Sequence, residues 1–575
     1  MSPPAAGPAP APFASIVLSE PSLSHLGRAF TYRVPDGMPV QVGSVVRVPF
    51  RRRNREGVVV ELLAESDVER TLNIKTVLGP GLDPDLVELC RWVAEHYLAT
   101  LGEALAAAVP DRVVEEEARP RERPARVRGR SIAWLRAYRE GAAIERALSG
   151  ARYAGFSWRP GPARASEIAS LAASAAARDR GVLVLLPEVR FSGETAEALA
   201  SLGDAVAWLG SDRTARERYH AWLDVRAGLK PIAVGGRSAV YAPVRDLGLV
   251  IVDDEAHVSY KERRAPRINA RAVASERARR AGAVFVAAGT PPSIEAGAAV
   301  ERGALTAVSS ARDEARRARP PVTVVDRSGD GAGLVPNVTT LRLCATELAA
   351  GRRVVLLIHR AGDEARRAAS RAFRILEPRR PARLDARTAP EKLAEAVRDA
   401  DCIVATPVIA KDLDIERVGL VAILEADAAL SVPEFRGAEE AFATWWHVGP
   451  WLRNGRMAIE TAQPDHPAIR ALVRWDPDLL YAWEASRRRE TGYPPFAGLA
   501  RIDLPPARGP AVASEVSQIP GVSVLGPLER GGKAVIVARA PSRTALIEGL
   551  APLVDKWRSA GEPIRVDVDP REVLP

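Results

Sequence analysis

Cysteine is scarce in this chain of 575 residues, and its scarcity excludes two classes of small stabilised domain. Only Cys90, Cys344 and Cys402 occur, and they lie far apart in the sequence. Three separated thiols cannot form a disulfide framework or a zinc site made of cysteine alone. So low a cysteine content is typical of proteins from a reducing compartment.

Long apolar runs are missing as well. No uncharged apolar stretch reaches the length of about 18 residues that a membrane-spanning helix needs. Residues 1–13 are rich in proline and alanine and have neither the basic nor the apolar region of a signal peptide, so we predict a disordered tail there. These absences predict a cytoplasmic protein without a membrane partner.

Lysine is rare although the chain is basic. The net charge is +9, and only seven of the 81 basic residues are lysine. A basic chain favours polyanionic partners such as nucleic acid, because each neutralised phosphate releases counterions. The alternative is that the abundant arginine reflects compositional bias, so charge alone does not decide.

The apolar pattern divides the chain into regions of different fold. Short alternating runs predict a small β domain over 14–110, in which a helix over 83–110 begins after Asp83 as N-cap. Fully apolar runs that alternate with helices predict two consecutive parallel-sheet lobes, of the α/β class, typical of a duplicated nucleotide-binding architecture. The predicted regions are a 1–13 tail, a 14–110 β domain, a 111–130 charged linker, a 131–315 first lobe, a 316–470 second lobe and a 471–575 α+β domain.

The sharpest motif is VIVDDEAH at 250–257. An apolar strand that delivers consecutive carboxylates at its end is typical of a Walker B segment, in which Asp254 holds Mg²⁺ and Glu255 polarises the attacking water. His257 then matches the nucleotide-sensing histidine of DEAH-type helicases. The alternative is an acidic loop that caps the next helix.

A Walker A loop, G-x-x-x-x-G-K-[ST], is absent. Lys533 is the only lysine that follows a glycine, but proline stands at the first glycine position and alanine at the Ser/Thr position. The expected place reads FSWRPGPARASEIASL, where prolines flank Gly161 and Arg164 is the nearest base on the C-terminal side. Prolines remove N–H donors and arginine does not reproduce a compact ammonium, so we predict a degenerate phosphate loop.

Several segments together resemble the PriA family of replication restart proteins. They are AFTYRVPDG and REGVVVEL near the N-terminus, LGLVIVDDEAHVSYKERRAPRINARAVASERA and AAGTPPSIEA in the first lobe, ATPVIAKDLDIERVGLVAILEADAALSVPEFRGAEEAF and IETAQPDHPAI in the second, and RRRETGYPPFAGLARI after it. The resemblance runs from about residue 14 to 575. It implies two tandem RecA-like helicase lobes, an N-terminal small β DNA-binding domain that captures 3′ ends, and a C-terminal α+β domain. A complete member is an ATP-dependent superfamily 2 DNA helicase.

The chain departs from the family pattern at functional segments. The arginine-finger segment, Q-x-x-G-R-x-x-R in the family, reads WHVGPWLRNGRM, so Arg453 and Arg456 remain at disturbed spacing. Gly289-Thr290 replaces Ala-Thr, and Lys411-Asp412 has aspartate where glycine is usual. The family's eight zinc-binding cysteines are missing, so zinc is not expected, and we interpret the lone His359 as a strand-end residue.

The resemblance also suggests DNA contacts. It implies that Phe30 and Tyr32 lie near the 3′-end pocket, where Thr31 replaces the family's aspartate, and that Arg237 faces the strand in the first lobe. The run RRRNRE lies between two predicted strands, which predicts a basic hairpin tip. Its candidate phosphate contacts are Arg51, Arg52, Arg53 and Arg55. The alternative for this tip is a solvated basic turn.

Three hypotheses follow. The first is a replication restart protein that recognises stalled or branched forks and promotes reloading of the replicative helicase, as a DNA-binding scaffold without helicase activity. The second is a weakly active ATP-dependent 3′→5′ DNA helicase, and the third is a pseudoenzyme that binds nucleotide as a structural ligand. The resemblance implies forked and single-stranded DNA, single-stranded DNA-binding protein and helicase loaders as partners, ATP and Mg²⁺ as ligands, and association with the nucleoid.

Overall fold

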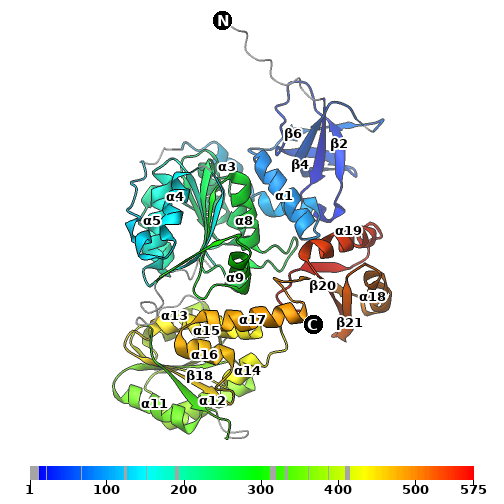
Figure 1. Ribbon diagram of the computed structural model, residues 1–575. Helices are drawn as coiled ribbons and strands as arrows, with labels where there is room; N and C mark the ends of the chain where they lie inside the picture. The colour runs from blue at the N-terminus through cyan, green and yellow to red at the C-terminus, as the bar shows by residue number, and fades with distance from the viewer. Residues whose placement is uncertain are drawn as a thin grey trace.

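The computed structural model describes residues 12–20, 22–66, 68–121, 126–150, 152–187, 193–310, 319–329, 335–359, 362–385, 387–407 and 415–574. Within these ranges the chain builds four β-sheets, two of them parallel, and the α/β fold class is confirmed (Figure 1). Among the helices that these ranges contain, none combines the length and apolar character needed to cross a bilayer. Most of the predicted tail, and Lys411 with Asp412, lie outside the described residues.

The N-terminal sheet has the strand order β5-β2-β1-β4-β3-β6. Its central strand β1 pairs antiparallel with both neighbours. The apolar side chains of one face form a cluster within the N-terminal domain, and those of the other face pack against helices. Both faces of the sheet are therefore buried. The strands are β1 (Phe13–Leu18), β2 (Ala29–Arg33), β3 (Val45–Phe50), β4 (Arg53–Leu63), β5 (Leu72–Asn73) and β6 (Thr76–Val77).

The single helix predicted over 83–110 is wrong, because the chain forms α1 (Pro84–His96) and α2 (Leu101–Ala108). Leu98 adopts a left-handed backbone conformation between them, with φ of 52°. Thr100 and Glu103 then form a reciprocal capping box that begins α2. Asp83 stands at the N-cap of α1 without a side-chain capping bond.

The first parallel sheet has the order β13-β7-β12-β11-β8-β10-β9. Separate apolar clusters cover its two faces, as expected for a parallel sheet buried between helices. Its strands are β7 (Ala154–Arg159), β8 (Gly181–Leu185), β9 (Val206–Trp208), β10 (Ile232–Gly235), β11 (Leu247–Val252), β12 (Val284–Ala288) and β13 (Thr306–Ser309). Its helices are α4 (Gly141–Ser149), α5 (Arg164–Ala176), α6 (Gly193–Ala200), α7 (Ala215–Arg226), α8 (Ala270–Ala281) and α9 (Ile294–Glu301).

The predicted linker contains a short ordered segment. Helix α3 (Val114–Glu117) packs against α7 of the first lobe, and Glu116 is fully buried there. The Glu116 carboxylate contacts His220 Nδ1 at 2.8 Å, and Arg121 binds Asp224 at 2.9 Å. This part of the predicted linker is therefore packed on the first lobe, because its charged residues pair with charged residues of α7.

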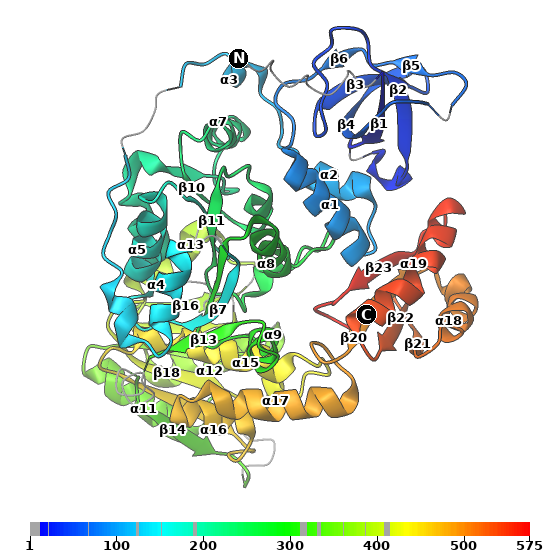
Figure 2. The same cartoon turned by 45° about the horizontal axis from the view of Figure 1, so that its top comes forward.

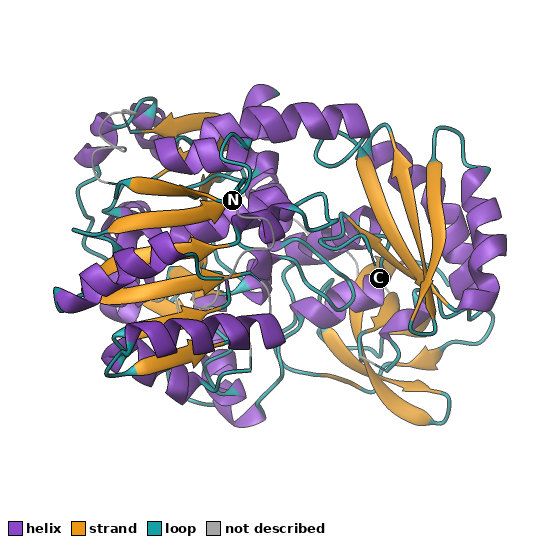
Figure 3. Cartoon of the chain, turned by 90° about the horizontal axis from the view of Figure 1, so that it is seen from below, coloured by secondary structure: helices purple, strands orange, loops and turns teal. Residues whose placement is uncertain are grey.

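The second parallel sheet has the order β14-β19-β18-β15-β17-β16. Its strands are β14 (Val322–Asp326), β15 (Arg353–Ile358), β16 (Pro381–Leu384), β17 (Cys402–Ala405), β18 (Val418–Leu424) and β19 (Arg456–Thr461). Its helices are α11 (Val338–Ala349), α12 (Asp363–Leu376), α13 (Pro390–Asp399), α14 (Ala426–Leu430), α15 (Gly437–His447) and α16 (Pro467–Arg474). Figure 3 shows helices flanking the strands.

The predicted boundary between 470 and 471 lies too early. Leu472, Trp475 and Leu480 belong to the apolar core of the second lobe, and α17 (Pro477–Thr491) packs on α16 and α9. The C-terminal sheet begins only at β20 (Gly498–Leu504). Its order is β21-β22-β20-β23, with β21 (Ser523–Arg530), β22 (Lys533–Ala540), β23 (Arg565–Val568), α18 (Gly509–Ser517) and α19 (Arg543–Ser559).

The C-terminal sheet lies beside the N-terminal domain and the first lobe (Figure 2). Arg543 and Arg558 of α19 donate to the backbone carbonyls of His96 at 2.8 Å and Leu98 at 3.1 Å. Lys261 of the first lobe binds Asp567 of β23 at 2.7 Å. These polar contacts join regions that are far apart in the sequence.

Candidate functional site

The degenerate phosphate loop lies where the sequence predicted it, between β7 and α5. Its one glycine N–H is already used, because Gly161 donates to the Tyr138 hydroxyl at 2.9 Å. That hydroxyl in turn contacts both carboxylate oxygens of Glu167, at 2.9 and 3.1 Å. Burial raises the pKa of Glu167, while the Tyr138 hydrogen bond opposes that shift. A tyrosine and a carboxylate therefore occupy the loop that would hold a phosphate.

Arg164 begins α5 and points to the end of β11. Its Nε lies 3.5 Å from an oxygen of the buried Asp253. Burial raises the pKa of Asp253, and the Arg164 guanidinium counteracts that shift. The nearest base of the loop is thus engaged by a carboxylate of its own lobe.

Asp254 follows β11 and is buried. His447, the last residue of α15 in the second lobe, places Nε2 3.2 Å from its carboxylate. Burial would raise the pKa of Asp254, but the nearby His447, His257 and Arg164 hold it well below its usual range. The other His447 nitrogen, Nδ1, lies 2.6 Å from the Ala443 carbonyl oxygen. Nδ1 therefore donates to that carbonyl, and Nε2 forms an ion pair with Asp254 when the imidazole is protonated.

Glu255 is also buried, and protein donors occupy both of its oxygens. Ser293 donates its backbone N–H to Oε1 at 2.7 Å and its hydroxyl to Oε2 at 2.9 Å. Arg271 Nη1 binds Oε2 at 2.6 Å. A carboxylate with this set of partners is held as an ion-pair anchor and is not aimed at a water molecule. Gly289 lies beside it, and a methyl group there would approach Glu255 Cγ at 3.3 Å.

His257 is held by its own segment. Its Nδ1 accepts the Ser259 backbone N–H at 3.1 Å and lies 2.8 Å from the Ser259 hydroxyl, which donates to the Pro187 carbonyl at 2.6 Å. The three residues of the DEAH motif are thus brought together at the end of β11, and each has a partner within the protein.

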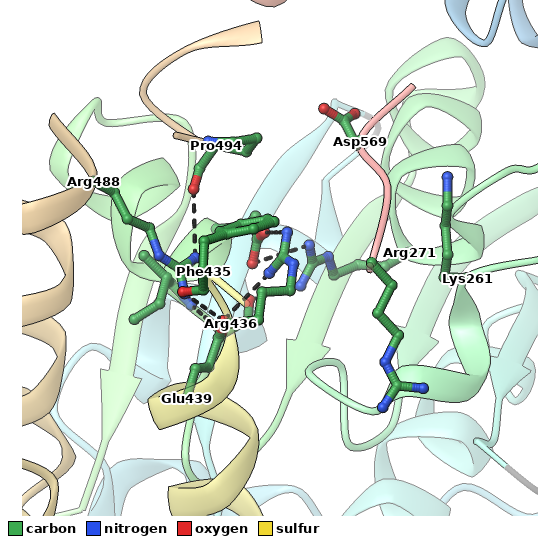
Figure 4. A network of polar contacts seen from close by, with 12 residues as sticks. Lys261, Arg271, Phe435, Arg436, Glu439, Arg488, Pro494 and Asp569 are labelled. Atoms are coloured by element: carbon green, nitrogen blue, oxygen red, sulfur yellow. Dashed lines mark hydrogen bonds and ion pairs between the residues drawn. The ribbon is translucent and has the colours of Figure 1, made fainter. Parts of the chain in front are cut away.

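A partly buried charge network extends from Arg271 into the second lobe (Figure 4). We use the name interlobe network for Arg271, Glu295, Arg436, Glu439 and Arg488. Arg271 lies 3.6 Å from Glu295, which binds Arg436 at 2.5 Å. Glu439 binds Arg436 at 3.3 Å and Arg488 at 2.9 Å. The charges alternate across the contact between α9, α15 and α17, so they join the two lobes.

The arginine-finger segment of the second lobe lies between α15 and β19. Arg456 begins β19 and lies 3.7 Å from Glu347 of α11. When the family pattern is set on Trp446 to Arg453, the glycine and the last arginine match, but Pro450 stands at the first arginine. His447 from this same segment is the residue that reaches the first lobe, and sequence reasoning missed it.

The two aromatic residues predicted to contact DNA differ in exposure. Tyr32 is only 4% exposed and donates its hydroxyl to the Pro49 carbonyl at 3.0 Å, so its predicted DNA contact is corrected to a packing role. Phe30 is half-buried; its ring meets Phe50 edge-on at 5.1 Å and carries the Arg28 guanidinium at 4.9 Å. Phe30 remains a candidate contact.

The basic hairpin is confirmed as a turn between β3 and β4. Arg51 and Arg52 form its tip with positive φ, and both are exposed, as is Arg53. Arg55 instead binds Glu20 at 2.9 Å. Arg51, Arg52 and Arg53 are therefore exposed to solvent, and the Arg51 guanidinium also lies over the Phe50 ring at 5.5 Å.

Arg237 is engaged within the first lobe. Its Nε binds Glu262 at 2.6 Å and its Nη1 donates to the Ser259 carbonyl at 3.2 Å. His359 follows β15 directly, as predicted, and accepts the Trp445 indole N–H at 2.7 Å. Tyr493 stacks on Phe435 of the second lobe, with ring centroids 4.9 Å apart.

Comparisons with known proteins agree with this architecture. Residues 15–110 match the family model described as the 3'DNA-binding domain (3'BD) of PriA. The chain is 28% identical to the replication restart protein PriA of Treponema pallidum, over 98% of this chain and 100% of that protein. It is 28% identical to the probable replication restart protein PriA of Mycobacterium bovis, over 88% of this chain and 90% of that protein.

Two solved structures align with this chain at lower sequence identity. RecG bound to a three-way DNA junction aligns with 69% of this chain and 52% of its own, at a TM-score of 0.42 and 15% identity. Dbp5 of S. cerevisiae, bound to RNA and ADP BeF3, aligns with 60% of this chain and 92% of its own, at a TM-score of 0.38 and 11% identity. Together with the matched N-terminal domain, these alignments show that the chain is similar over most of its length to replication restart proteins named PriA.

Proposed function

We propose that this protein is a replication restart factor that recognises stalled or branched forks and promotes reloading of the replicative helicase, as a scaffold that does not hydrolyse ATP. Two findings support the restart role: the matched 3'DNA-binding domain and full-length relatives named for replication restart. The observation that carries the scaffold role is the phosphate loop, in which the Tyr138 hydroxyl accepts the Gly161 N–H and itself contacts Glu167.

The residues of the degenerate phosphate loop do not fit ATP. A triphosphate at the loop would meet the Glu167 carboxylate instead of free N–H donors, and no lysine stands there. Mg²⁺ at Asp254 would have to displace the His447 ring, whose Nε2 lies 3.2 Å from that carboxylate. Loss of such preorganised electrostatic stabilisation raises the activation barrier of phosphoryl transfer by several kcal/mol. The loss of one donor alone raises it by about 3–4 kcal/mol.

The interlobe network supports the same proposal by a second route. A helicase must open and close its lobes as nucleotide binds and leaves. Here each lobe contributes partly buried charges, and separation of the lobes would break the pair between Glu295 and Arg436. The ion pairs between the lobes therefore oppose their separation and support the scaffold proposal.

The weakly active 3′→5′ helicase is the second candidate. Its supporting observation is that Asp254, Glu255 and His257 are retained together at the end of β11. In this case ATP would have to break the Tyr138–Glu167 contact and release Glu255 from Arg271. The partners implied by the resemblance, single-stranded DNA-binding protein and helicase loaders, belong to the proposed function in either case.

The test compares forks that differ only at the leading-strand 3′ end. A fork with a free 3′ hydroxyl at the branch and the same fork with a 3′ phosphate are titrated, each with and without Mg²⁺ and ATP. We expect tighter binding of the free end and equal affinities with and without ATP. Binding that is indifferent to the 3′ end would contradict end capture, and ATP-dependent affinity would contradict the scaffold.

A matched pair of variants checks where the end binds. Phe30→Ala removes the half-buried ring from β2, whereas Phe13→Ala removes a half-buried ring from the neighbouring strand β1. We expect only Phe30→Ala to erase the preference for the free 3′ hydroxyl. Equal loss in both variants would show general damage to the domain.

A further inference from the structure

The chain crosses from the C-terminal sheet to the second lobe in a short strap after β23. We use the name C-terminal strap for residues 570–574, none of which belongs to a helix or a strand. Arg501 of β20 donates to the backbone carbonyls of Glu572 at 3.3 Å and Leu574 at 2.7 Å. The strap is thus attached to its own domain at one side, while its other contacts are made with the second lobe.

The second lobe holds the strap through two carboxylates. Glu434, in the loop between α14 and α15, accepts the backbone N–H of Val573 at 2.9 Å with one oxygen and that of Leu574 at 3.1 Å with the other. Arg571 forms two hydrogen bonds with Glu440 of α15, at 2.9 and 3.1 Å. Three of the five strap residues therefore bind the second lobe by polar contacts.

Val573 adds an apolar contact at the same place. Its side chain is buried in one cluster with Phe435 of the second lobe and with Leu499, Val535 and Val537 of the C-terminal sheet. Phe435 directly follows Glu434, so the polar and apolar contacts of the strap meet at one point of the second lobe. The docked strap therefore fixes the position of Phe435 against the sheet.

Phe435 in turn contacts two arginines of the interlobe network (Figure 4). The guanidinium groups of Arg436 and Arg488 lie 4.8 and 5.2 Å from the centre of its ring. Arg488 also donates to the Phe435 carbonyl at 3.4 Å. Arg436 binds Glu295 of α9 at 2.5 Å, so a continuous series of contacts runs from the strap to the first lobe.

The ion pair that joins the strap directly to the first lobe is weak by comparison. Glu572 lies 3.8 Å from Arg263, and both side chains are mostly exposed. Exposed pairs of this kind add little to stability. The route through Phe435 is therefore the stronger connection, because its members are buried or only partly exposed.

We propose that the C-terminal strap is a coupling element through which the C-terminal domain controls the junction between the two lobes. With the strap docked, Phe435 supports Arg436 and Arg488 in the positions from which they bind Glu295 and Glu439. With the strap displaced, Phe435 loses its contact with Val573, and the arginines lose a fixed support. A ligand that displaces the strap would thus loosen the lobes without touching the DEAH motif.

This inference goes beyond the proposed function, because it concerns how the lobes are held together and is tested without DNA or ATP. Coupling between two sites is reciprocal: displacing the strap should loosen the lobe junction, and loosening the junction should release the strap. A contact with only local structural importance would not produce both effects. The two directions therefore form the test, with amide hydrogen exchange of the full-length protein as the readout.

The first variant is Val573→Asp, which places a carboxylate in the apolar cluster beside Glu434 and should displace the strap. The matched control is Leu574→Asp, the same change at the neighbouring side chain, which is 38% exposed. We expect exchange in the strap and in α9 to become about tenfold faster in Val573→Asp and to stay unchanged in the control. Exchange in β20 and β22 reports whether the C-terminal sheet remains folded.

A milder variant covers the case in which Val573→Asp also unfolds that sheet. Arg571→Gln removes the pair with Glu440, in which both side chains are about one-third exposed, and leaves the apolar cluster intact. It should accelerate exchange in the strap and in α9 together, by a smaller factor than Val573→Asp. Faster exchange in the strap alone would overturn the coupling.

The reverse direction starts from the first lobe. Glu295→Gln breaks the charge pair with Arg436 and should accelerate exchange of the strap amides. Its control is Glu301→Gln on the same helix, because Glu301 pairs with Arg489 at the surface. The proposal is overturned if the strap amides of Glu295→Gln exchange as in the wild type, if both glutamate variants act equally, or if the strap of Val573→Asp remains protected. Fork recognition is unaffected by any of these results.

Discussion

Replacing Arg488 by methionine should destabilise the junction between the lobes strongly. Arg488 is 1% exposed and pairs with Glu484 at 3.0 Å and with Glu439 at 2.9 Å. Glu439 would keep Arg436 and the Ile294 N–H, at 3.3 and 3.1 Å. The larger loss is therefore at Glu484.

The unpaired Glu484 determines how much stability Arg488→Met loses. It is fully buried, one of its oxygens has no hydrogen-bond partner, and Arg488 binds the other. Leaving such a charge unpaired costs about 3–5 kcal/mol. Burial raises the pKa of Glu484, and Arg488 partly offsets this, so the variant should raise that pKa further. A carboxylic acid with a raised folded-state pKa gains a proton as pH falls, so the loss should be smaller at about pH 5 than at about pH 8.

Amide hydrogen exchange in α9 and α17 measures the local free energy of opening. Arg489→Met on the same helix is the matched control, because Arg489 pairs with Glu301 on the surface and is 48% exposed. Exposed pairs contribute about 0–1 kcal/mol. The double variant Arg488→Met/Glu484→Gln should recover part of the loss. A loss in Arg488→Met no larger than in the control, or one independent of pH, would refute the reasoning.

Other predictions concern the loop, the hairpin and acid stability. Tyr138→Phe should lower the free energy of unfolding in urea by about 1–3 kcal/mol, because it leaves Glu167 and the Gly161 N–H without their hydrogen-bond partner. A gain in stability would contradict the role of Tyr138 in the degenerate phosphate loop. The double variant Arg51→Gln/Arg52→Gln should reduce the slope of log affinity for single-stranded DNA against log salt concentration by about 1.4 in magnitude. Arg55→Gln should leave that slope unchanged, because Arg55 binds Glu20. Equal slopes in the two variants would refute the hairpin contact. Burial lowers the pKa of His359 to about 4, so stability should fall as pH drops from about 6.5 toward 4, by up to about 1.4 kcal/mol per unit; unfolding curves of His359→Gln should lack this component, and an unchanged pH profile would contradict it.

Local pattern predicted much of the fold. The DEAH strand, the position of the phosphate loop before α5 and the basic turn at Arg51 each depend on neighbours within a few residues. The break at Leu98 was missed, because an apolar helical pattern continues through it and only the capping box at Thr100 marks the restart. The early domain boundary has a similar cause: α16 and α17 read as ordinary helices, and only packing assigns them to the second lobe.

The chemistry of the site depends on contacts between distant segments, which no spacing reveals. Tyr138 precedes Glu167 by 29 residues, and Glu439 reaches the Ile294 N–H across 145. His447 meets Asp254 from the other lobe. A sequence shows that Walker A is missing, but the identity of the groups that take its place follows only from the folded chain.

The most direct test of the account is ATP turnover by the purified full-length protein on a fork with a leading-strand 3′ end, with binding recorded in the same samples. The control is Asp254→Asn, which changes the carboxylate that a hydrolysing site would need for Mg²⁺. We predict fork binding with no turnover above the control. Fork-stimulated turnover that Asp254→Asn abolishes would contradict the scaffold and show that the loop at Gly161 still admits a phosphate.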